Sequence, residues 1–244
     1  MVFCPGDSMP AKPGNNSREL SRRCRARSRL SKIEASIDGY YTQKISAFGA
    51  TPRGVDWSCA HTQELRHMKL LTLCDFSAPF SLNDIGCGYG ALVGHLATHY
   101  ADSEIDYLGI DISAAMIRRA RRRWPRRDSV SFLVGSESPR IADYSVASGI
   151  FNVKLNHPVQ MWTWYIARLL TQMHLTSRRG FAVNFIAPPM QCLASPSSLY
   201  RTKPDPWIRY CEHEFGSKTE LIAGYGLHEF TLLVWQNGSR SHVQ

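Results

Sequence analysis

The chain has 244 residues, of which 43% are hydrophobic, so one substantial α/β core is expected and two full domains are not. No stretch approaches the roughly twenty consecutive apolar residues that span a bilayer. The N-terminus lacks the apolar segment of a secretory leader, so we expect a cytoplasmic protein. The seven cysteines are scattered and never spaced C-x-x-C, which argues against a disulfide framework or a metal site.

The formal net charge of +9 comes mainly from two runs. Residues 1–32 carry eight basic and two acidic residues, and residues 118–127 contain seven arginines and no acid. Such runs bind phosphate groups, so a nucleic-acid partner is left open as the less favoured alternative. A solvated helix face explains 118–127 more simply, because its arginines would point several ways around a helix.

The N-terminal part is predicted to be helical after a basic extension. Residues 1–31 are expected to be disordered or a frayed helix, because 1–16 are rich in proline, glycine and polar residues. Apolar residues at helical spacing predict a helix over 17–48, ended by Gly49, and a second helix over 62–74. We therefore expect a helical cap over 32–78 and a core domain over 79–238.

Short apolar strands alternate with helices through the core, a pattern typical of a parallel sheet covered on both faces. The connection between the last two strands is too short for a crossover helix, so they are expected to form an antiparallel hairpin at the sheet edge. The predicted strands are 81–85, 105–110, 130–134, 145–150, 180–186, 220–224 and 229–235, and the predicted helices are 91–100, 113–124, 159–174 and 206–215.

A glycine-rich turn follows the first predicted core strand, in Asp84-Ile85-Gly86-Cys87-Gly88-Tyr89-Gly90. Glycine lets a backbone approach a nucleotide-like ligand and tolerates positive φ. About twenty residues further on, Asp111 ends the second strand, where a carboxylate can accept hydrogen bonds from ribose hydroxyls. The pattern predicts an adenosine-containing cofactor.

Two cofactor classes share this pattern. Gly86 to Ala91 satisfies the dinucleotide fingerprint G-x-G-x-x-G/A, and Asp84 to Gly90 satisfies an acid-x-G-x-G-x-G pattern. An acid at the end of the first strand is unfavourable beside a pyrophosphate but suits a positively charged amino group. The closing hairpin also replaces the second nucleotide-binding half of a dehydrogenase, so the second pattern is favoured.

The segment resembles motif I of class I S-adenosylmethionine-dependent methyltransferases, and the order of elements from about 81 to 235 matches their Rossmann-like, seven-stranded, mostly parallel α/β fold. The resemblance implies S-adenosylmethionine as cofactor, with Asp111 on its ribose hydroxyls and Arg66 paired with its methionine carboxylate. Ser136 departs from the aspartate that the family often places beside the adenine. The full set of implied cofactor contacts is Arg66, Asp84, Gly86, Cys87, Gly88, Gly90, Asp111, Ile112, Met116, Ser136 and Ser148.

The acceptor is expected to be a small metabolite or sugar, methylated at a hydroxyl or carboxylate oxygen. Residues 147–152 lack the Asp/Asn-Pro-Pro-aromatic sequence of enzymes that methylate bases, which weakens the alternative of an RNA methyltransferase. A non-catalytic cofactor-binding partner of another methyltransferase is the second alternative. Nothing in the sequence indicates an oligomeric state.

Methyl transfer depends chiefly on in-line positioning, although oxygen acceptors often need a general base as well. Lys154 and His157 follow the fourth strand and Tyr225 lies in the final hairpin, so these are the candidate catalytic residues. His228 and Glu229 lie beside Tyr225, and Asn152 is a candidate for orienting the acceptor.

Overall fold

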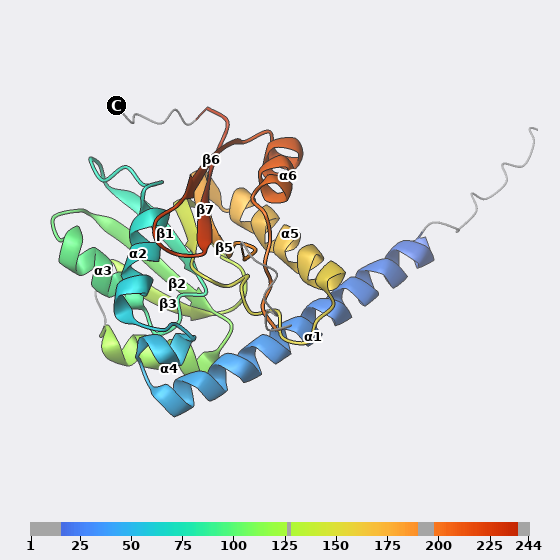
Figure 1. Ribbon diagram of the computed structural model, residues 1–244, viewed down its shortest axis with the longest axis horizontal. Helices are drawn as coiled ribbons and strands as arrows, with labels where there is room; N and C mark the ends of the chain where they lie inside the picture. The colour runs from blue at the N-terminus through green and yellow to red at the C-terminus, as the bar shows by residue number, and fades with distance from the viewer. Residues whose placement is uncertain (1–15, 126–127, 190–197, 239–244) are drawn as a thin grey trace, which may run out of the picture.

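A computed structural model describes residues 16–125, 128–189 and 198–238 as one sheet with helices on both faces (Figure 1). The strands are β1 (Phe80–Ile85), β2 (Ile105–Asp111), β3 (Val130–Val134), β4 (Ala142–Ala147), β5 (Ser177–Ile186), β6 (Lys218–Ala223) and β7 (Glu229–Trp235). The helices are α1 (Asn16–Phe48), the short 3-10 helix η1 (Pro52–Val55), α2 (Ala60–Leu71), α3 (Ala91–His99), α4 (Ala114–Arg123), α5 (Val159–Leu175) and α6 (Asp205–Phe215).

The seven strands are arranged in the order β3-β2-β1-β4-β5-β7-β6. Strands β1 to β5 are parallel, and β7 runs antiparallel to both β5 and β6. The predicted mostly parallel sheet and its C-terminal antiparallel hairpin are therefore confirmed. Within the hairpin, β6 is the edge strand and β7 lies inside the sheet. The complete burial of β7 agrees with this position.

Each face of the sheet is covered by a separate hydrophobic core. Helices α2, α3 and α4 cover one face with residues such as Leu70, Leu92 and Ile117. Helices α5 and α6 cover the other face, where Trp162 and Trp207 are buried. This two-sided burial explains why the central strands are nearly continuous apolar runs.

Helix α1 lies across the carboxyl ends of the strands and extends from the α4 side to the α5 side (Figure 1). Its Ile33 and Ile37 belong to the α5 core, whereas Ile45 packs with Tyr89 and Met116 near α4. The helix continues without a break across the predicted boundary between residues 31 and 32. Residues 1–15 of the predicted extension lie outside the described residues.

Strand β4 ends at Ala147, three residues before the predicted end at Ile150. Gly149 has a φ of +76°, which is incompatible with an extended strand and turns the chain after Ser148. The predicted strand end at Ile150 is therefore wrong, because residues 148–150 form part of a cavity wall and not of the sheet.

No helix within the described ranges is both long enough and apolar enough to cross a membrane.

Two glycine-to-alanine substitutions should have opposite effects on stability. A Cβ at Gly180 would lie 2.5 Å from the carbonyl oxygen of Val234, whereas a Cβ at Gly39 would meet no atom within 4 Å. We expect Gly180→Ala to lower the free energy of unfolding by about 1–3 kcal/mol. Gly39→Ala should raise it by about 0.5–1 kcal/mol, because alanine favours the helix. Urea unfolding of both variants measures this, and equal midpoints would contradict the packing around β5.

Candidate active site

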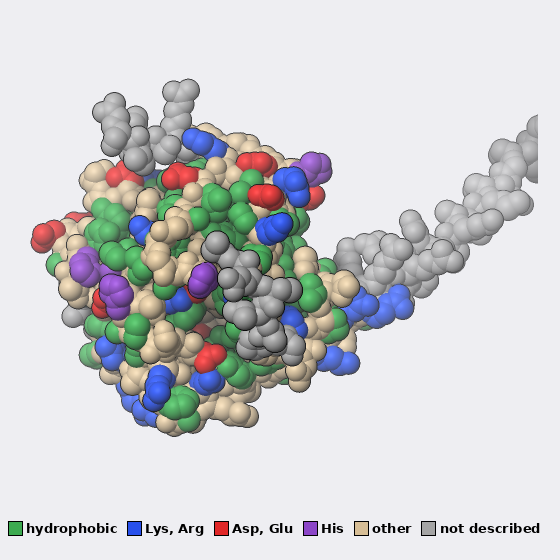
Figure 2. All heavy atoms as spheres, in the orientation of Figure 1, with side chains coloured by type: hydrophobic (Ala, Val, Ile, Leu, Met, Phe, Trp, Pro, Cys, Tyr) green, Lys and Arg blue, Asp and Glu red, His purple; other side chains and the backbone are tan. Residues whose placement is uncertain are grey.

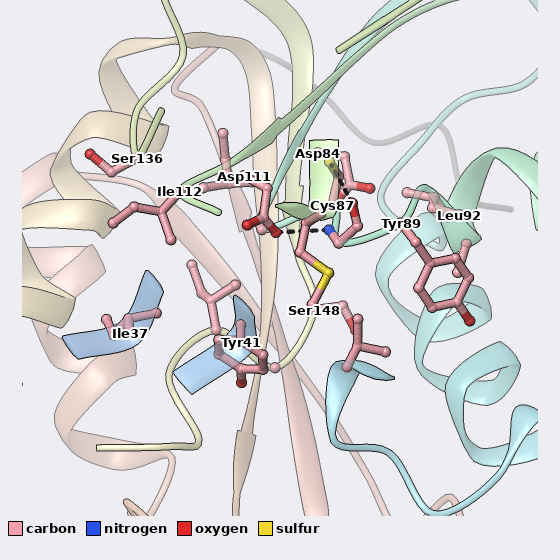
Figure 3. Close-up of a pocket in the computed structure, with 18 of the residues that line it drawn as sticks. Ile37, Tyr41, Asp84, Cys87, Tyr89, Leu92, Asp111, Ile112, Ser136 and Ser148 are labelled. Atoms are coloured by element: carbon pink, nitrogen blue, oxygen red, sulfur yellow. Dashed lines mark hydrogen bonds between the residues drawn. The ribbon is translucent and has the colours of Figure 1, made fainter. Parts of the chain in front are cut away.

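A cavity lies at the carboxyl ends of β1, β2 and β4, where α1 covers the sheet edge (Figure 3). The empty space within and around it is about 880 Å³, a figure that includes open solvent at its mouth. Strand β1 is flanked by β2 on one side and β4 on the other, so the strand order reverses here. Ligands of open α/β sheets bind at such switch points, and the cavity is in this position.

The glycine turn forms the floor of the cavity. Gly86, Gly88 and Gly90 have φ values of +76°, +57° and +78°, in the left-handed region that favours glycine. A Cβ at Gly86 would lie 2.1 Å from Ile150, and one at Gly88 would lie 2.8 Å from Val55. The turn therefore brings bare backbone to the cavity, with no side chain at these two positions.

Asp111 joins this turn to the start of α4. Its Oδ2 accepts a hydrogen bond from the Gly88 backbone N–H (2.9 Å), and its Oδ1 accepts one from the Ser113 N–H (2.8 Å). The carboxylate faces the cavity in Figure 3. Burial raises the pKa of Asp111 to about 6, although the two backbone hydrogen bonds act in the opposite direction.

Asp84 is the second buried carboxylate at the cavity. Its Oδ2 accepts a hydrogen bond from the hydroxyl of Tyr107 at 2.7 Å. Burial raises the pKa of Asp84 to about 7, and the hydrogen bond from Tyr107 offsets this only in part. The two carboxylates give the cavity a negative character that suits a positively charged ligand group.

The cavity brings together most of the predicted cofactor contacts. Its lining includes Asp84, Gly86, Cys87, Gly88, Asp111, Ile112, Met116, Ser136 and Ser148. The Ser148 hydroxyl is buried and has no hydrogen-bond partner among the described residues. A bare glycine floor, a carboxylate that faces the cavity and an unpaired hydroxyl fit an adenosine cofactor. Gly90 is outside the lining, where its carbonyl accepts a hydrogen bond from Trp124 Nε1.

Arg66 lies elsewhere, in a buried ion pair with Glu229. Its Nε donates to Glu229 Oε2 (2.7 Å), its Nη2 donates to Glu229 Oε1 (2.6 Å), and its Nη1 donates to the carbonyl of Thr62 (2.8 Å). Arg66 is not among the residues that line the cavity. Glu229 therefore occupies the donors that the sequence assigned to the methionine carboxylate, and the assignment of Arg66 stays a prediction.

Gln63 and His67 face the cavity from the same helix, and the sequence analysis did not single them out as ligands. Gln63 Oε1 accepts a hydrogen bond from Tyr89, which fixes the amide. Burial lowers the pKa of His67 to about 3, so its imidazole is neutral near pH 7. The sequence feature that could have identified them is their i, i+4 spacing, which places both on the buried face of α2.

The three predicted catalytic residues lie outside the cavity lining. His157 Nε2 is 2.6 Å from the Ser36 hydroxyl, and Lys154 Nζ donates to the carbonyls of Leu155 and His157. The Tyr225 hydroxyl is 3.2 Å from Thr231 Oγ1. Their catalytic assignment stays a prediction, and each has a local structural partner.

The fold and the cavity are those expected of a class I methyltransferase. The family model described as "Methyltransferase domain" matches residues 83–176. The Mycobacterium tuberculosis protein Rv1506c, which its name describes as a methyltransferase, is 38% identical over 167 residues, covering 68% of this chain and 98% of that protein. The chain therefore belongs to the S-adenosylmethionine-dependent methyltransferases.

Solved structures share this fold at low sequence identity. The N-methyltransferase NodS from Bradyrhizobium japonicum, bound to S-adenosylhomocysteine, has a TM-score of 0.58 at 16% identity and covers 82% of this chain and 98% of its own. Magnesium protoporphyrin IX methyltransferase from Synechocystis has a TM-score of 0.53 at 16% identity, covering 72% and 83%. CalO1, a methyltransferase of calicheamicin biosynthesis, has a TM-score of 0.55 at 16% identity, covering 82% and 60%.

The raised pKa of Asp84 predicts a pH-dependent stability. The folded protein binds a proton that the unfolded chain releases above its ordinary pKa of 3.8, so this group's contribution is lost as the pH rises from about 4 through 7. Asp84→Asn removes the titrating group. As the pH rises through that window, the free energy of unfolding of the variant should therefore increase by about 1 kcal/mol or more relative to that of wild type. Urea unfolding at several pH values measures the difference, with exposed Asp106→Asn as the control. A stability difference between Asp84→Asn and wild type that does not change with pH would contradict the raised pKa of Asp84.

Proposed function

We propose that this protein methylates an oxygen atom of a small metabolite or sugar, with Asp111 holding the ribose hydroxyls of S-adenosylmethionine. The observation that carries the proposal is the cavity itself, in which the buried Asp111 carboxylate and the bare glycine turn face one space beneath α1. Bound S-adenosylmethionine supplies an already activated methyl group. The protein's own contribution is then to bind, orient and exclude water.

The apolar and polar parts of the cavity suggest how the cofactor would be oriented. Ile112 lies beyond Asp111 and Ser136 follows β3, so this end suits an adenine ring. Gln63 and His67 lie at the other end, beside the glycine turn. Both are neutral groups able to donate a hydrogen bond to the methionine carboxylate. Asp84 is the group suited to the positive α-amino group.

The solved relatives support a small acceptor. Two of the structures given above are named for porphyrin and calicheamicin metabolism, and another neighbour is the pyocyanin biosynthetic protein PhzM. NodS is named as an N-methyltransferase, so these names bear on the size of the acceptor and not on the acceptor atom.

The arginines of α4 do not favour the RNA alternative. Arg118, Arg119 and Arg121–Arg123 are exposed, and none of them lines the cavity. Lys and Arg side chains form small separate groups on the face shown in Figure 2 rather than one continuous patch. A single phosphate-binding track is therefore absent from the described residues of that face.

Asp111→Asn should weaken S-adenosylhomocysteine binding about 10- to 100-fold, because ribose hydroxyls would lose a charged acceptor in a buried site. Isothermal titration calorimetry measures the dissociation constants. The matched control is Asp106→Asn, a carboxylate on the same strand whose side chain is 60% exposed. Failure of folded wild-type protein to bind S-adenosylhomocysteine would overturn the cofactor site, and unchanged affinity in Asp111→Asn would overturn the ribose assignment.

Gln63→Ala and His67→Ala test the proposed methionine end. Each should weaken S-adenosylhomocysteine about 5- to 50-fold, the value of one or two hydrogen bonds to a charged group. Each should leave the affinity for 5′-methylthioadenosine nearly unchanged, because that ligand lacks the amino-acid portion. Calorimetry with both ligands separates local from global effects. Equal losses for the two ligands would show that these residues do not hold the methionine end.

A further inference from the structure

The Trp57 ring packs against both a guanidinium group and a glycine at the cavity wall, and we call this arrangement the clamp. The Arg66 Cζ atom lies 3.8 Å from the centroid of the Trp57 ring system. On the Gly149 side, a Cβ added to that glycine would lie 2.2 Å from Cζ2 and 2.5 Å from Cη2 of Trp57. The indole therefore occupies the space that any larger residue at 149 would need. Trp57 and Gly149 both line the cavity.

Glu229 fixes both sides of this clamp. Its carboxylate holds Arg66 through two hydrogen bonds and accepts a third from Asn184 Nδ2 at 2.9 Å. The Oδ1 atom of Asn184 in turn accepts the backbone N–H of Gly149 at 2.7 Å. Two routes thus lead from Glu229 to the Gly149 turn, one through Arg66 and Trp57 and the other through Asn184.

Stability alone gives little reason for this arrangement. Arg66 and Glu229 are 6% and 8% exposed, and Asn184 is fully buried. A buried ion pair often stabilises a protein no more than apolar residues of the same volume. Its distinct property is geometry, because a bidentate guanidinium pair has one orientation and presents a flat face for an aromatic ring.

The clamped segment lies where the cofactor sulfur would be under the proposed function. Gly149 follows β4, and β4 is paired with β1 through Asp84 and Val146. The sulfur joins the ribose to the methionine portion, so a cofactor held at Asp111 and at the α2 end places it between them, at the ends of β1 and β4. The unpaired Ser148 hydroxyl is at the same point of the wall.

We propose that Trp57 is a positioning residue that forms the wall beside the cofactor sulfur, and that Glu229 holds this wall through Arg66 and Asn184. This inference rests on the proposed cofactor site. It identifies the device, formed by the chain's own residues, that shapes the reaction centre. The device joins the loop after η1 and the adjoining helix α2 to the β4 turn and two strands that are distant in sequence.

S-adenosylmethionine and S-adenosylhomocysteine provide a local probe of this wall, because they differ only in the methyl group and charge at sulfur. The ratio of their dissociation constants therefore reports the surroundings of the sulfur and needs no knowledge of the acceptor. Trp57→Ala should weaken S-adenosylmethionine about fourfold more than S-adenosylhomocysteine, the value of one buried methyl group. Trp57→Phe keeps an aromatic ring and should restore most of the wild-type ratio.

Arg66→Lys tests the supporting pair without leaving Glu229 unpaired. Lysine keeps the charge but loses the flat face and the bidentate geometry, so the ratio should change in the same direction as in Trp57→Ala, by about twofold. Trp164→Ala is the matched control, because Trp164 is a partly exposed tryptophan of α5 outside the cavity lining. Its ratio should equal that of wild type.

The inference is overturned if folded Trp57→Ala and Arg66→Lys both keep the wild-type ratio, whatever their absolute affinities. Equal weakening of both ligands would indicate a purely structural role for Trp57. Failure of wild-type protein to bind either ligand is a separate result, which would overturn the cofactor site on which the inference rests.

Discussion

The reversal of strand order at β1 is the constraint on which the site depends. The chain builds β2 and β3 on one side of β1 and then crosses to β4 on the other side. The connections leaving β1 and β4 therefore diverge and cannot fill the space above their ends. The glycine turn enters this space from β1, and the Gly149 turn enters it from β4. Both turns need positive φ, because each must leave its strand sharply while keeping its backbone close to the cavity.

The charged groups around the cavity favour a cationic ligand. Arg66 and Glu229 neutralise each other in a buried pair at the wall. Asp84 and Asp111 are buried with neutral hydrogen-bond donors, and burial raises the pKa of both. A ligand with positive amino and sulfonium groups would favour the ionised forms by Coulomb attraction, which opposes the burial that makes ionisation costly in the ligand-free protein. The carboxylates of Asp84 and Asp111 therefore favour the binding of a positively charged ligand.

Helix α1, which covers the cavity, is hydrogen-bonded both to the start of α4 and to the loop that carries Trp57. Thr42 of α1 lies 2.7 Å from the Ser113 hydroxyl at the start of α4, next to Asp111. Tyr40 donates a hydrogen bond to Asp56, which anchors the loop that carries Trp57 to α1. Helix α1, the Asp111–Ser113 segment and Trp57 are therefore parts of one connected structure.

The local sequence determined the glycine turn, Asp111 and the alternation of strands and helices. These features depend on short-range rules, namely glycine's tolerance of positive φ and the burial of apolar strands, so they could be predicted with small errors at element ends. The end of β4 was misplaced because the apolar Ile150 resembles a strand end, whereas the chain turns into the cavity wall at Ser148-Gly149-Ile150. Only the tertiary structure decided the partner of Arg66, since Glu229 is 163 residues away and any carboxylate, including a ligand's, satisfies a guanidinium equally well. It likewise decided that Gln63, His67 and Trp57 face the cavity. The i, i+4 spacing of Gln63 and His67 indicates a shared helix face but not what that face packs against.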